Sequence, residues 1–225
     1  FDAVEKELVT LIKQYPEAPE GYVALARNLL KQKKNEYAVR AAEKAVALAP
    51  LNPKPYIMLG MARLRHEDMP GAAEAFGRAL ELDKNSVRAL LGAAAVKMHD
   101  EHFEDALDLC GRVIKIDPED QRVHELIARI KLKQGNADDA MPALRKVLEQ
   151  DGSNPRAMRA YIKLLREEGR LDEVVSLAET QLASESLTPK TVARYARLVS
   201  VAGRPDLAVT QYRTLQKKDG LSLVE

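Results

Sequence analysis

The fold is decided by residues 53–86, PKPYIMLGMARLRHEDMPGAAEAFGRALELDKNS, because their pattern returns every 34 residues in both directions along the chain. Small residues stand at the eighth, twentieth and twenty-seventh positions of this stretch (Gly60, Ala72 and Ala79), and a large ring, Phe76, stands at the twenty-fourth. Where two helices cross, small residues let the backbones approach, and larger side chains fill the space beside them. The stretch therefore predicts two short helices joined by a tight turn.

Six consecutive repeats of this pattern fit the chain without insertion or deletion. They comprise residues 19–52, 53–86, 87–120, 121–154, 155–188 and 189–222. The eighth position of the six repeats reads Ala26, Gly60, Ala94, Ala128, Ile162 and Ala196, and the twentieth reads Ala38, Ala72, Ala106, Ala140, Val174 and Ala208. Residues 1–18 fit as the second helix of a preceding partial repeat, and residues 223–225 fit as the start of a further, truncated segment. A fixed period of this length predicts a helical solenoid.

The pattern resembles the tetratricopeptide repeat, a 34-residue helix-turn-helix with Leu-Gly at positions 7–8, Ala at 20 and 27, and an aromatic ring at 24. This resemblance covers almost the whole chain. It implies an all-α fold in which stacked helix pairs wind into a right-handed superhelix. The first helix of each repeat would line the concave face, and the second would lie on the outer face. We expect the chain to be a piece of a longer array, because it starts and ends within a repeat.

Composition and motifs exclude several other classes of protein. The single cysteine, Cys110, excludes a disulfide framework and a cysteine-based zinc finger, and at position 24 we expect it to be a small core residue. No run approaches 18 apolar residues, so the sequence predicts no membrane span. It also has no Gly-rich phosphate loop, nucleophile elbow or HExxH motif. We therefore expect no enzyme activity, no cofactor and no bound metal, and we read residues 99–102, HDEH, as a solvated turn.

The fifteenth position of the repeat lies in the turn between the two helices. The fourth, fifth and sixth repeats have Gly there, which suits a helix end that contains a left-handed residue. The first three repeats have Lys33, Glu67 and Glu101 instead. We expect these three repeats to make the turn in a different way.

Charge is strongly segregated within the repeats, although the chain as a whole has a formal net charge of only +1. Positions 1–14 of the six repeats hold eighteen Lys and Arg against five Asp and Glu, and the rest of the chain has an excess of twelve acidic residues. The first helices, which the resemblance places on the concave face, are therefore basic. A basic surface favours an anionic partner.

Positions 2, 5, 9 and 12 of the first helices are expected to face the concave groove. Five of the six repeats have Lys or Arg at position 2, where a cation opposes the helix macrodipole at a cost of about 0.3–1 kcal/mol. The expected binding residues form a basic set, Arg88, Arg122, Arg129, Arg156, Arg159, Lys163, Arg166, Lys190, Arg194 and Arg197, and an apolar set, Ile57, Met61 and Leu91. Two other interpretations stay open. The basic side chains could instead pair with acids of adjacent repeats, and the apolar stripe could be ordinary core.

These patterns predict a non-catalytic protein–protein interaction scaffold, part of a larger multi-protein assembly. Its basic groove would bind an acidic or mixed apolar and acidic peptide segment. Two alternatives stay open: by resemblance, a scaffold of a bacterial polysaccharide synthesis or secretion machine that contacts an anionic polysaccharide, and a self-assembling spacer module. We do not expect nucleic acid as a partner, because the groove lacks aromatic residues on which bases would stack. We expect a soluble chain without direct membrane insertion, in the cytoplasm or periplasm or within a larger membrane-associated protein.

Overall fold

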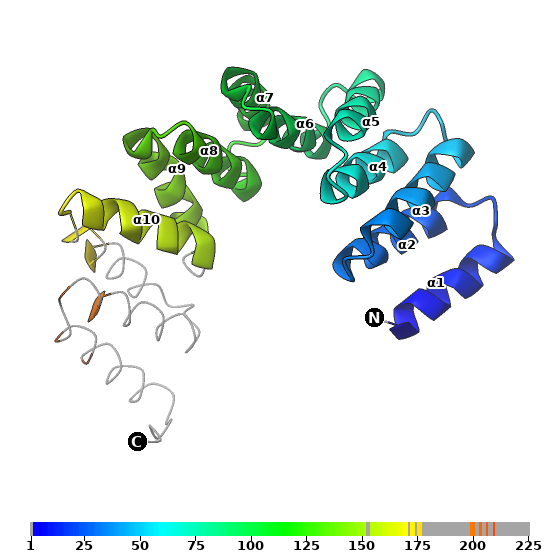
Figure 1. The fold of residues 1–225 in the computed structure, drawn as a ribbon, viewed down its shortest axis with the longest axis horizontal. Coiled ribbons are helices and arrows are strands. Elements are labelled where there is room, and N and C mark those ends of the chain that lie inside the picture. The colour runs from blue at the N-terminus through cyan, green and yellow to red at the C-terminus, as the bar shows by residue number, and fades with distance from the viewer. Residues whose placement is uncertain are drawn as a thin grey trace. The chain divides into compact units, whose positions relative to one another are not determined.

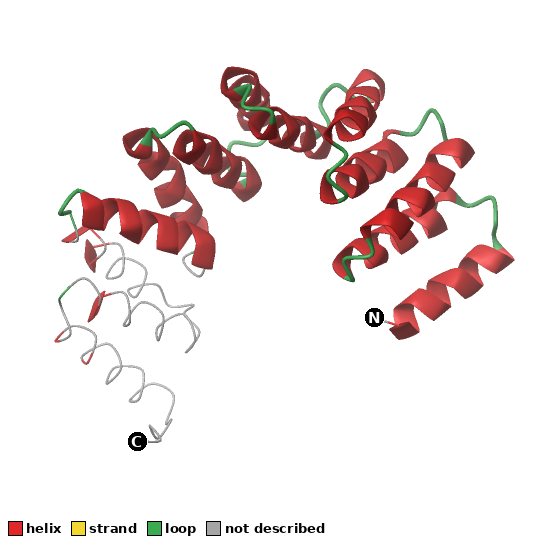
Figure 2. Cartoon of the chain, in the orientation of Figure 1, coloured by secondary structure: helices red, strands yellow, loops and turns green. Residues whose placement is uncertain are grey.

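The computed structural model describes residues 2–151, 154–170, 172–173, 175–176, 199–200, 203, 206 and 209. Within these residues the protein is all-helical and contains no strand, as Figure 2 shows. The helices labelled in Figure 1 are α1 Asp2–Gln14, α2 Pro19–Lys31, α3 Asn35–Leu48, α4 Pro53–Arg65, α5 Met69–Leu82, α6 Val87–His99, α7 Phe103–Ile116, α8 Gln121–Lys133, α9 Ala137–Gln150 and α10 Pro155–Glu167. The prediction of an all-α fold is therefore confirmed.

The chain divides into two compact blocks, Phe1–Leu126 and Ile127–Glu225, and α8 begins in the first and ends in the second. In the N-terminal block α2 packs on α3, α4 on α5 and α6 on α7, and α3 and α5 also pack on the helix that follows each of them. In the C-terminal block α9 packs on α10. One pair of helices falls within each of the first four predicted repeats. Most of the last two repeats lies outside the described residues, so the number of six repeats stays a prediction.

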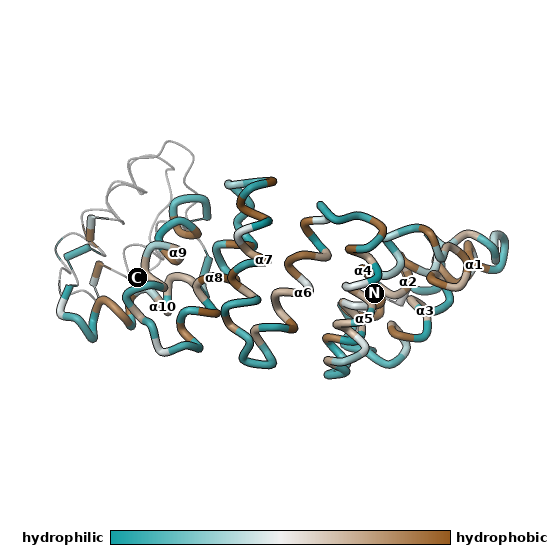
Figure 3. Tube along the Cα trace, turned by 90° about the horizontal axis from the view of Figure 1, so that it is seen from above, coloured by the Kyte–Doolittle hydropathy of each residue, from teal (hydrophilic) through white to brown (hydrophobic). Residues whose placement is uncertain are grey.

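The predicted small residues at the helix crossings are buried. Ala26, Ala38, Ala72, Ala94 and Ala106 each have an exposed fraction of 0%. Hydrophobic and hydrophilic segments alternate along the helices in Figure 3, as expected for helices that bury one face and keep the other in water. The small residues therefore hold the repeat together in the way that the sequence pattern predicts.

The ring of Phe76 on α5 is the largest fully buried side chain at a crossing, with an exposed fraction of 0%. It lies against two glycines on different helices. A Cβ atom built on Gly60 of α4 would be 2.8 Å from the ring, and one built on Gly92 of α6 would be 2.3 Å from it. Gly60 was expected as a small residue at position 8, whereas Gly92, at position 6 of the next repeat, was not.

The turn between the two helices has the same backbone conformation in every repeat where it is described. The position-15 residues all have positive φ: Lys33 at 61°, Glu67 at 66°, Glu101 at 62°, Gly135 at 78°, Gly169 at 70° and Gly203 at 84°. The expectation that the first three repeats turn in a different way was therefore wrong. For a residue with a Cβ atom, the left-handed region costs about 1–2 kcal/mol.

Two hydrogen bonds explain why the left-handed turn persists without glycine. In the second repeat the Asp68 amide donates to the Arg63 carbonyl at 2.9 Å, and the Glu67 amide donates to the Leu64 carbonyl at 3.4 Å. This pair of bonds is the Schellman motif, which satisfies carbonyls at the end of a helix. The motif brings the chain back along the helix it has just left, so the packing of the helix pair outweighs the local preference of Glu.

Candidate binding surfaces

A row of four basic side chains lies along α10 in the C-terminal block. Arg156, Arg159, Lys163 and Arg166 are all exposed, and their spacing of three, four and three residues puts them on one face of the helix. The opposite face carries the buried residues Ala157, Met158, Tyr161, Leu164 and Leu165. We call the four basic residues the α10 basic row. The structure thus brings together four of the residues that the sequence predicted.

Three members of the α10 basic row have no acidic partner among the described residues. Only Lys163 has one, because its Nζ atom lies 3.8 Å from Glu167 Oε1. The α10 helix begins at Asn154, whose Oδ1 atom accepts hydrogen bonds from the backbone amides of Arg156 and Ala157 at 3.1 Å each. This cap is neutral, so it does not cancel the charge of Arg156 beside it.

Arg122, at the start of α8, is engaged by an acidic residue of its own helix cap. Asp120, only 9% exposed, accepts hydrogen bonds from the Arg122 backbone amide at 2.9 Å and from Arg122 Nε at 3.0 Å. Hydrogen bonds from the Arg122 side chain are the largest cause that lowers the pKa of Asp120 below its usual value. The interpretation that a basic side chain pairs with a nearby acid is therefore right for Arg122.

The remaining members of the predicted basic set fall into two groups. Arg88 at the start of α6 and Arg129 on α8 are exposed, and neither has an acidic partner within the described part of the chain. The predicted residues Lys190, Arg194 and Arg197 lie outside the described residues. Of the predicted basic set, the members without an acidic partner among the described residues are thus Arg88, Arg129, Arg156, Arg159 and Arg166.

The predicted apolar set does not form one surface. Ile57 is only 9% exposed and packs in the core with Ala79 and Ala89. Met61 has an exposed fraction of 42%, and Leu91 is half-buried. The prediction that Ile57 is a binding residue is therefore corrected. Ile57 belongs to the core between the helices, and a partner has no access to most of its side chain.

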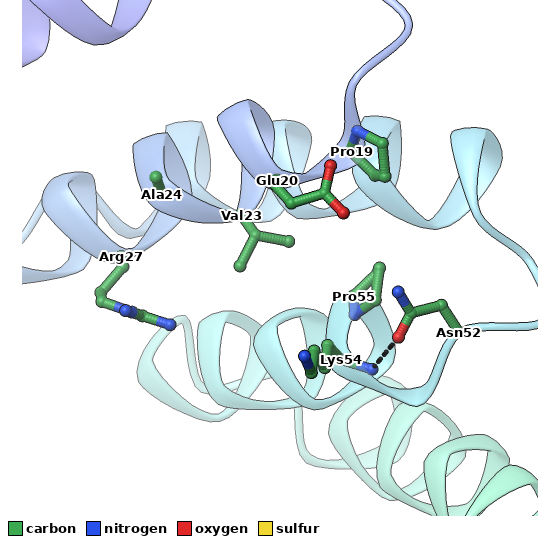
Figure 4. A pocket seen from close by; sticks show the side chains of 8 residues that line it. All are labelled: Pro19, Glu20, Val23, Ala24, Arg27, Asn52, Lys54 and Pro55. Carbon is green, nitrogen blue, oxygen red and sulfur yellow. Dashed lines mark hydrogen bonds between the residues drawn. The ribbon is translucent and has the colours of Figure 1, made fainter.

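A small pocket lies between α2 and the start of α4, as Figure 4 shows. Its volume is about 240 Å³, and it is lined by Pro19, Glu20, Val23, Ala24, Arg27, Asn52, Lys54 and Pro55. Val23 lies between the two helices, and Arg27 reaches from α2 toward α4. Arg27 and Lys54 are exposed and have no acidic partner among the described residues. The pocket therefore combines an apolar wall with two cations, Arg27 and Lys54, and one acid, Glu20.

Sequence reasoning did not single out Pro19, Ala24 or Pro55 as lining residues of this pocket. The available signal was the pair of prolines at positions 1 and 3 of neighbouring repeats. Such prolines at a helix start have no amide to donate. The Pro19 ring provides an apolar edge, whereas the Pro55 ring is fully buried. An apolar site therefore lies one repeat earlier than the predicted set of Ile57, Met61 and Leu91.

Comparison with known proteins establishes the family. A family model described as tetratricopeptide repeat matches residues 63–130 and 131–200, which together make up more than half of the chain. The chain belongs to the tetratricopeptide repeat family. Proteins of this family are interaction scaffolds that bind protein or peptide partners, and they are generally non-catalytic. No curated protein matches the sequence.

Solved structures of other tetratricopeptide repeat proteins have the same fold. The structure of pilF from Pseudomonas aeruginosa is similar with a TM-score of 0.66 and 20% identity, over 92% of this chain and 95% of that one. A thermophilic tetratricopeptide repeat protein from Thermus thermophilus gives a TM-score of 0.62 and 18% identity, over 81% and 99% of the two chains. YrrB, described as a tetratricopeptide repeat protein with an unusual peptide-binding site, gives 0.54 and 16%, over 92% and 97%. At these identities the likeness concerns the fold alone.

The cysteine and three histidines that could react or bind a metal lie in the core, at a turn or against a loop. Cys110 on α7 is fully buried, and burial raises the pKa of its thiol to about 12. His99 and His102 are exposed at the turn between α6 and α7. His124 Nε2 lies 2.9 Å from the Pro118 carbonyl oxygen, which ties the ring to the preceding loop.

None of the helices in the described part of the chain combines the length and apolar character that a membrane crossing requires.

Proposed function

We propose that this chain is a non-catalytic scaffold that binds an acidic or mixed apolar and acidic peptide segment. The observation that carries the proposal is the α10 basic row, with three guanidinium groups that have no acidic partner among the described residues. Guanidinium groups bind carboxylates through two parallel hydrogen bonds, which are stronger than neutral ones. A row of such groups favours a partner with several carboxylates.

The spacing of the α10 basic row matches the dimensions of a peptide. Ten residues separate Arg156 from Arg166, which corresponds to about 15 Å along a helix. An extended peptide covers this distance with about five residues, so that alternate side chains place about three carboxylates along the row. A partner segment with Asp or Glu at every second position therefore fits the row.

The pocket between α2 and α4 supports the mixed character of the partner. Its wall of Pro19 and Val23 and its volume of about 240 Å³ suit one large apolar side chain. The cations Arg27 and Lys54 beside it would bind a carboxylate next to that side chain. We therefore expect the partner to carry apolar as well as acidic residues.

Charge reversal of the α10 basic row tests the proposal. The double variant Arg159→Glu and Lys163→Glu should weaken binding of a fluorescein-labelled Glu-Leu peptide by at least about tenfold, measured by anisotropy. The matched control is Lys13→Glu with Lys115→Glu, two exposed basic residues elsewhere on the chain that change the net charge by the same amount. Equal affinities of the two double variants would refute the role of the row.

Salt dependence separates the peptide from an anionic polysaccharide. When salt rises from about 50 to about 200 mM, an anionic polymer held by many charge contacts loses affinity steeply. Its binding is driven by the release of counterions, and this release gains less free energy at higher salt. A peptide with an apolar anchor should keep most of its affinity over this range. A steep loss for the peptide as well would favour the polymer as the natural ligand.

A further inference from the structure

A second and larger pocket lies among α1, α2 and α3 of the N-terminal block. Its volume is about 500 Å³, and its lining includes Val9, Leu25, Leu29, Lys34, Tyr37 and Arg40. The α2 residues that line this pocket are Tyr22, Leu25 and Leu29. The α2 residues that line the pocket between α2 and α4 lie on the opposite side of the helix; they are Glu20, Val23, Ala24 and Arg27. The two pockets therefore flank the same helix from opposite sides.

In the second repeat, the place that corresponds to this pocket is filled by a side chain. Position 11, which is Leu29 in the first repeat, is Arg63 in the second. The guanidinium group of Arg63 donates to the Gly71 carbonyl at 3.1 Å. It also lies 3.3 Å from Glu43, 3.7 Å from Asp68 and 3.6 Å from Glu74. One long basic side chain thus occupies the space between three helices and meets three acids there.

The third and fourth repeats use the same position in a similar way. Lys97 Nζ lies 3.0 Å from Asp105 Oδ2, and Lys131 Nζ lies 3.3 Å from Asp139 Oδ2. Each pair joins position 11 of the first helix to position 19 of the second. A basic side chain at position 11 therefore bridges the helix pair in three successive repeats.

The first repeat has different chemistry at every corresponding residue, and the sign of the charge is reversed at two of them. The positions of Glu43, Asp68 and Glu74 are taken, 34 residues earlier, by Val9, Lys34 and Arg40. The position of Gly71 is taken by Tyr37, which is 59% exposed. Where the second repeat has a cation inside a ring of acids, the first has an apolar floor inside a rim of cations.

Two of the three cations of this rim pair with acids, and the third does not. Lys34 Nζ lies 3.0 Å from Glu5, and Arg40 lies 2.6 Å from Glu36 and stacks on the Tyr37 ring at 5.8 Å. Lys44 is exposed and has no acidic partner within the described part of the chain. With Glu5 in the lining and Glu36 paired to Arg40, three cations face two acids, which leaves a net charge of +1.

We propose that this pocket is a second docking surface, which binds a partner protein segment that carries a large apolar side chain flanked by carboxylates. The apolar side chain packs on Val9 and Leu25, and Leu29, only 5% exposed, forms the closed floor beneath them. The carboxylates face Lys44 and the paired cations Lys34 and Arg40. The open rim favours a protein segment, because small-molecule sites enclose most of the ligand surface. Exposed Tyr and Arg side chains are also enriched where proteins meet.

A variant that fills the pocket gives the sharpest test. Leu29→Arg combined with Val9→Glu and Arg40→Glu introduces the counterparts of Arg63 and of two of its three acidic neighbours, Glu43 and Glu74. The probe is a short peptide in which Phe-Leu is flanked on each side by Glu-Glu, and binding is followed through the NMR amide signals of Leu25, Tyr37 and Ala41. We expect these signals to shift in the natural chain, and the filled variant to bind at least about tenfold more weakly.

A second variant protects the test against misfolding of the first. Tyr37→Ala with Lys44→Glu changes only exposed side chains, and its affinity for the peptide should fall to a similar degree. The α10 variant Arg159→Glu with Lys163→Glu should leave the shifts of Leu25, Tyr37 and Ala41 unchanged. That result separates this surface from the proposed function of the α10 basic row.

Three outcomes would overturn the proposal. The first is undiminished peptide binding by both pocket variants. The second is equal binding of a peptide in which Lys replaces every Glu. The third is saturable binding of anilinonaphthalene sulfonate at these residues without any binding of the peptide, which would assign the pocket to a small amphiphilic anion.

Discussion

The substitution Gly92→Ala tests how tightly the Phe76 ring joins three helices. The added Cβ atom would lie 2.3 Å from two ring carbons, whereas carbons in good contact are about 3.5–4.0 Å apart. A movement of the ring toward α4 brings it against the backbone at Gly60, which is already so near that a Cβ atom built there would be 2.8 Å from the ring. The backbones of α5 and α6 must therefore separate, or the ring must leave its rotamer.

The expected cost follows from two opposing effects. Overpacking of a core by one methyl group costs about 1–3 kcal/mol, and the large overlap places Gly92→Ala near the upper end. Alanine gains up to about 1 kcal/mol over glycine inside a helix. We expect a net loss of about 2 kcal/mol in the free energy of unfolding, measured by urea denaturation with circular dichroism.

Two glycines of the same chain are matched controls. Gly77 on α5 and Gly111 on α7 have no atom within 4 Å of a built Cβ, so Ala at either position should stabilise the chain by up to about 1 kcal/mol. Phe76→Leu should reduce the penalty of Gly92→Ala, because the shorter side chain removes the overlap. The reasoning is refuted if Gly92→Ala behaves like Gly77→Ala, or if its penalty is the same with Leu at position 76.

Four further predictions follow from local geometry. Glu67→Gly should raise the free energy of unfolding by about 1 kcal/mol in urea, because glycine adopts positive φ without the steric cost; a loss would contradict this. Arg63→Leu should lower it by about 1–3 kcal/mol, because the Gly71 carbonyl and the Glu43 carboxylate lose their hydrogen-bond donor. Cys110 should react with iodoacetamide only as fast as the chain unfolds, and rapid labelling of the folded chain would argue against a buried thiol. Asp120 has a lowered pKa, so its stabilising effect is complete above its usual pKa of about 3.9 and is lost as pH falls through the lowered value; Asp120→Asn should therefore cost stability at neutral pH and weaken the acid dependence of thermal unfolding.

The sequence predicts the helix pairs because their packing depends on position within the repeat. Ala26, Ala38 and Ala72 recur at the crossings since only small residues allow the backbones to approach, and this requirement is visible at a fixed spacing. The same reasoning does not predict Gly92. Its small size is demanded by Phe76 of the preceding repeat, so the constraint appears at one site only and leaves no periodic signal.

The turns and the apolar set show where local rules fail. Lys33, Glu67 and Glu101 disfavour positive φ, but two hydrogen bonds and the packing of the helix pair impose it. Ile57 and Met61 lie four residues apart on one helix, and the sequence does not distinguish the buried residue from the exposed one. That difference depends on the next repeat, because Ile57 is covered by Ala89 of α6.

Whether a basic residue is available to a ligand depends on its individual partners, which its position in the repeat does not reveal. Position within the repeat predicts that Arg122 and Arg156 are equivalent, yet within the described part of the chain only Arg122 is engaged by an acid. The signal was present two residues earlier, where the fourth repeat has Asp120 and the fifth has Asn154. An acid at the helix cap followed by Arg in the first turn indicates an internal ion pair, and an amide at that place leaves the Arg available.

The position of α2 between two pockets has a thermodynamic consequence. A ligand on one side that changes the position or rigidity of this single helix changes the affinity of the ligand on the other side. Linkage requires the effect to be reciprocal, so each ligand alters the binding free energy of the other by the same amount. Thirteen residues of one helix would therefore be sufficient to make two partners on opposite faces cooperate or compete without touching each other.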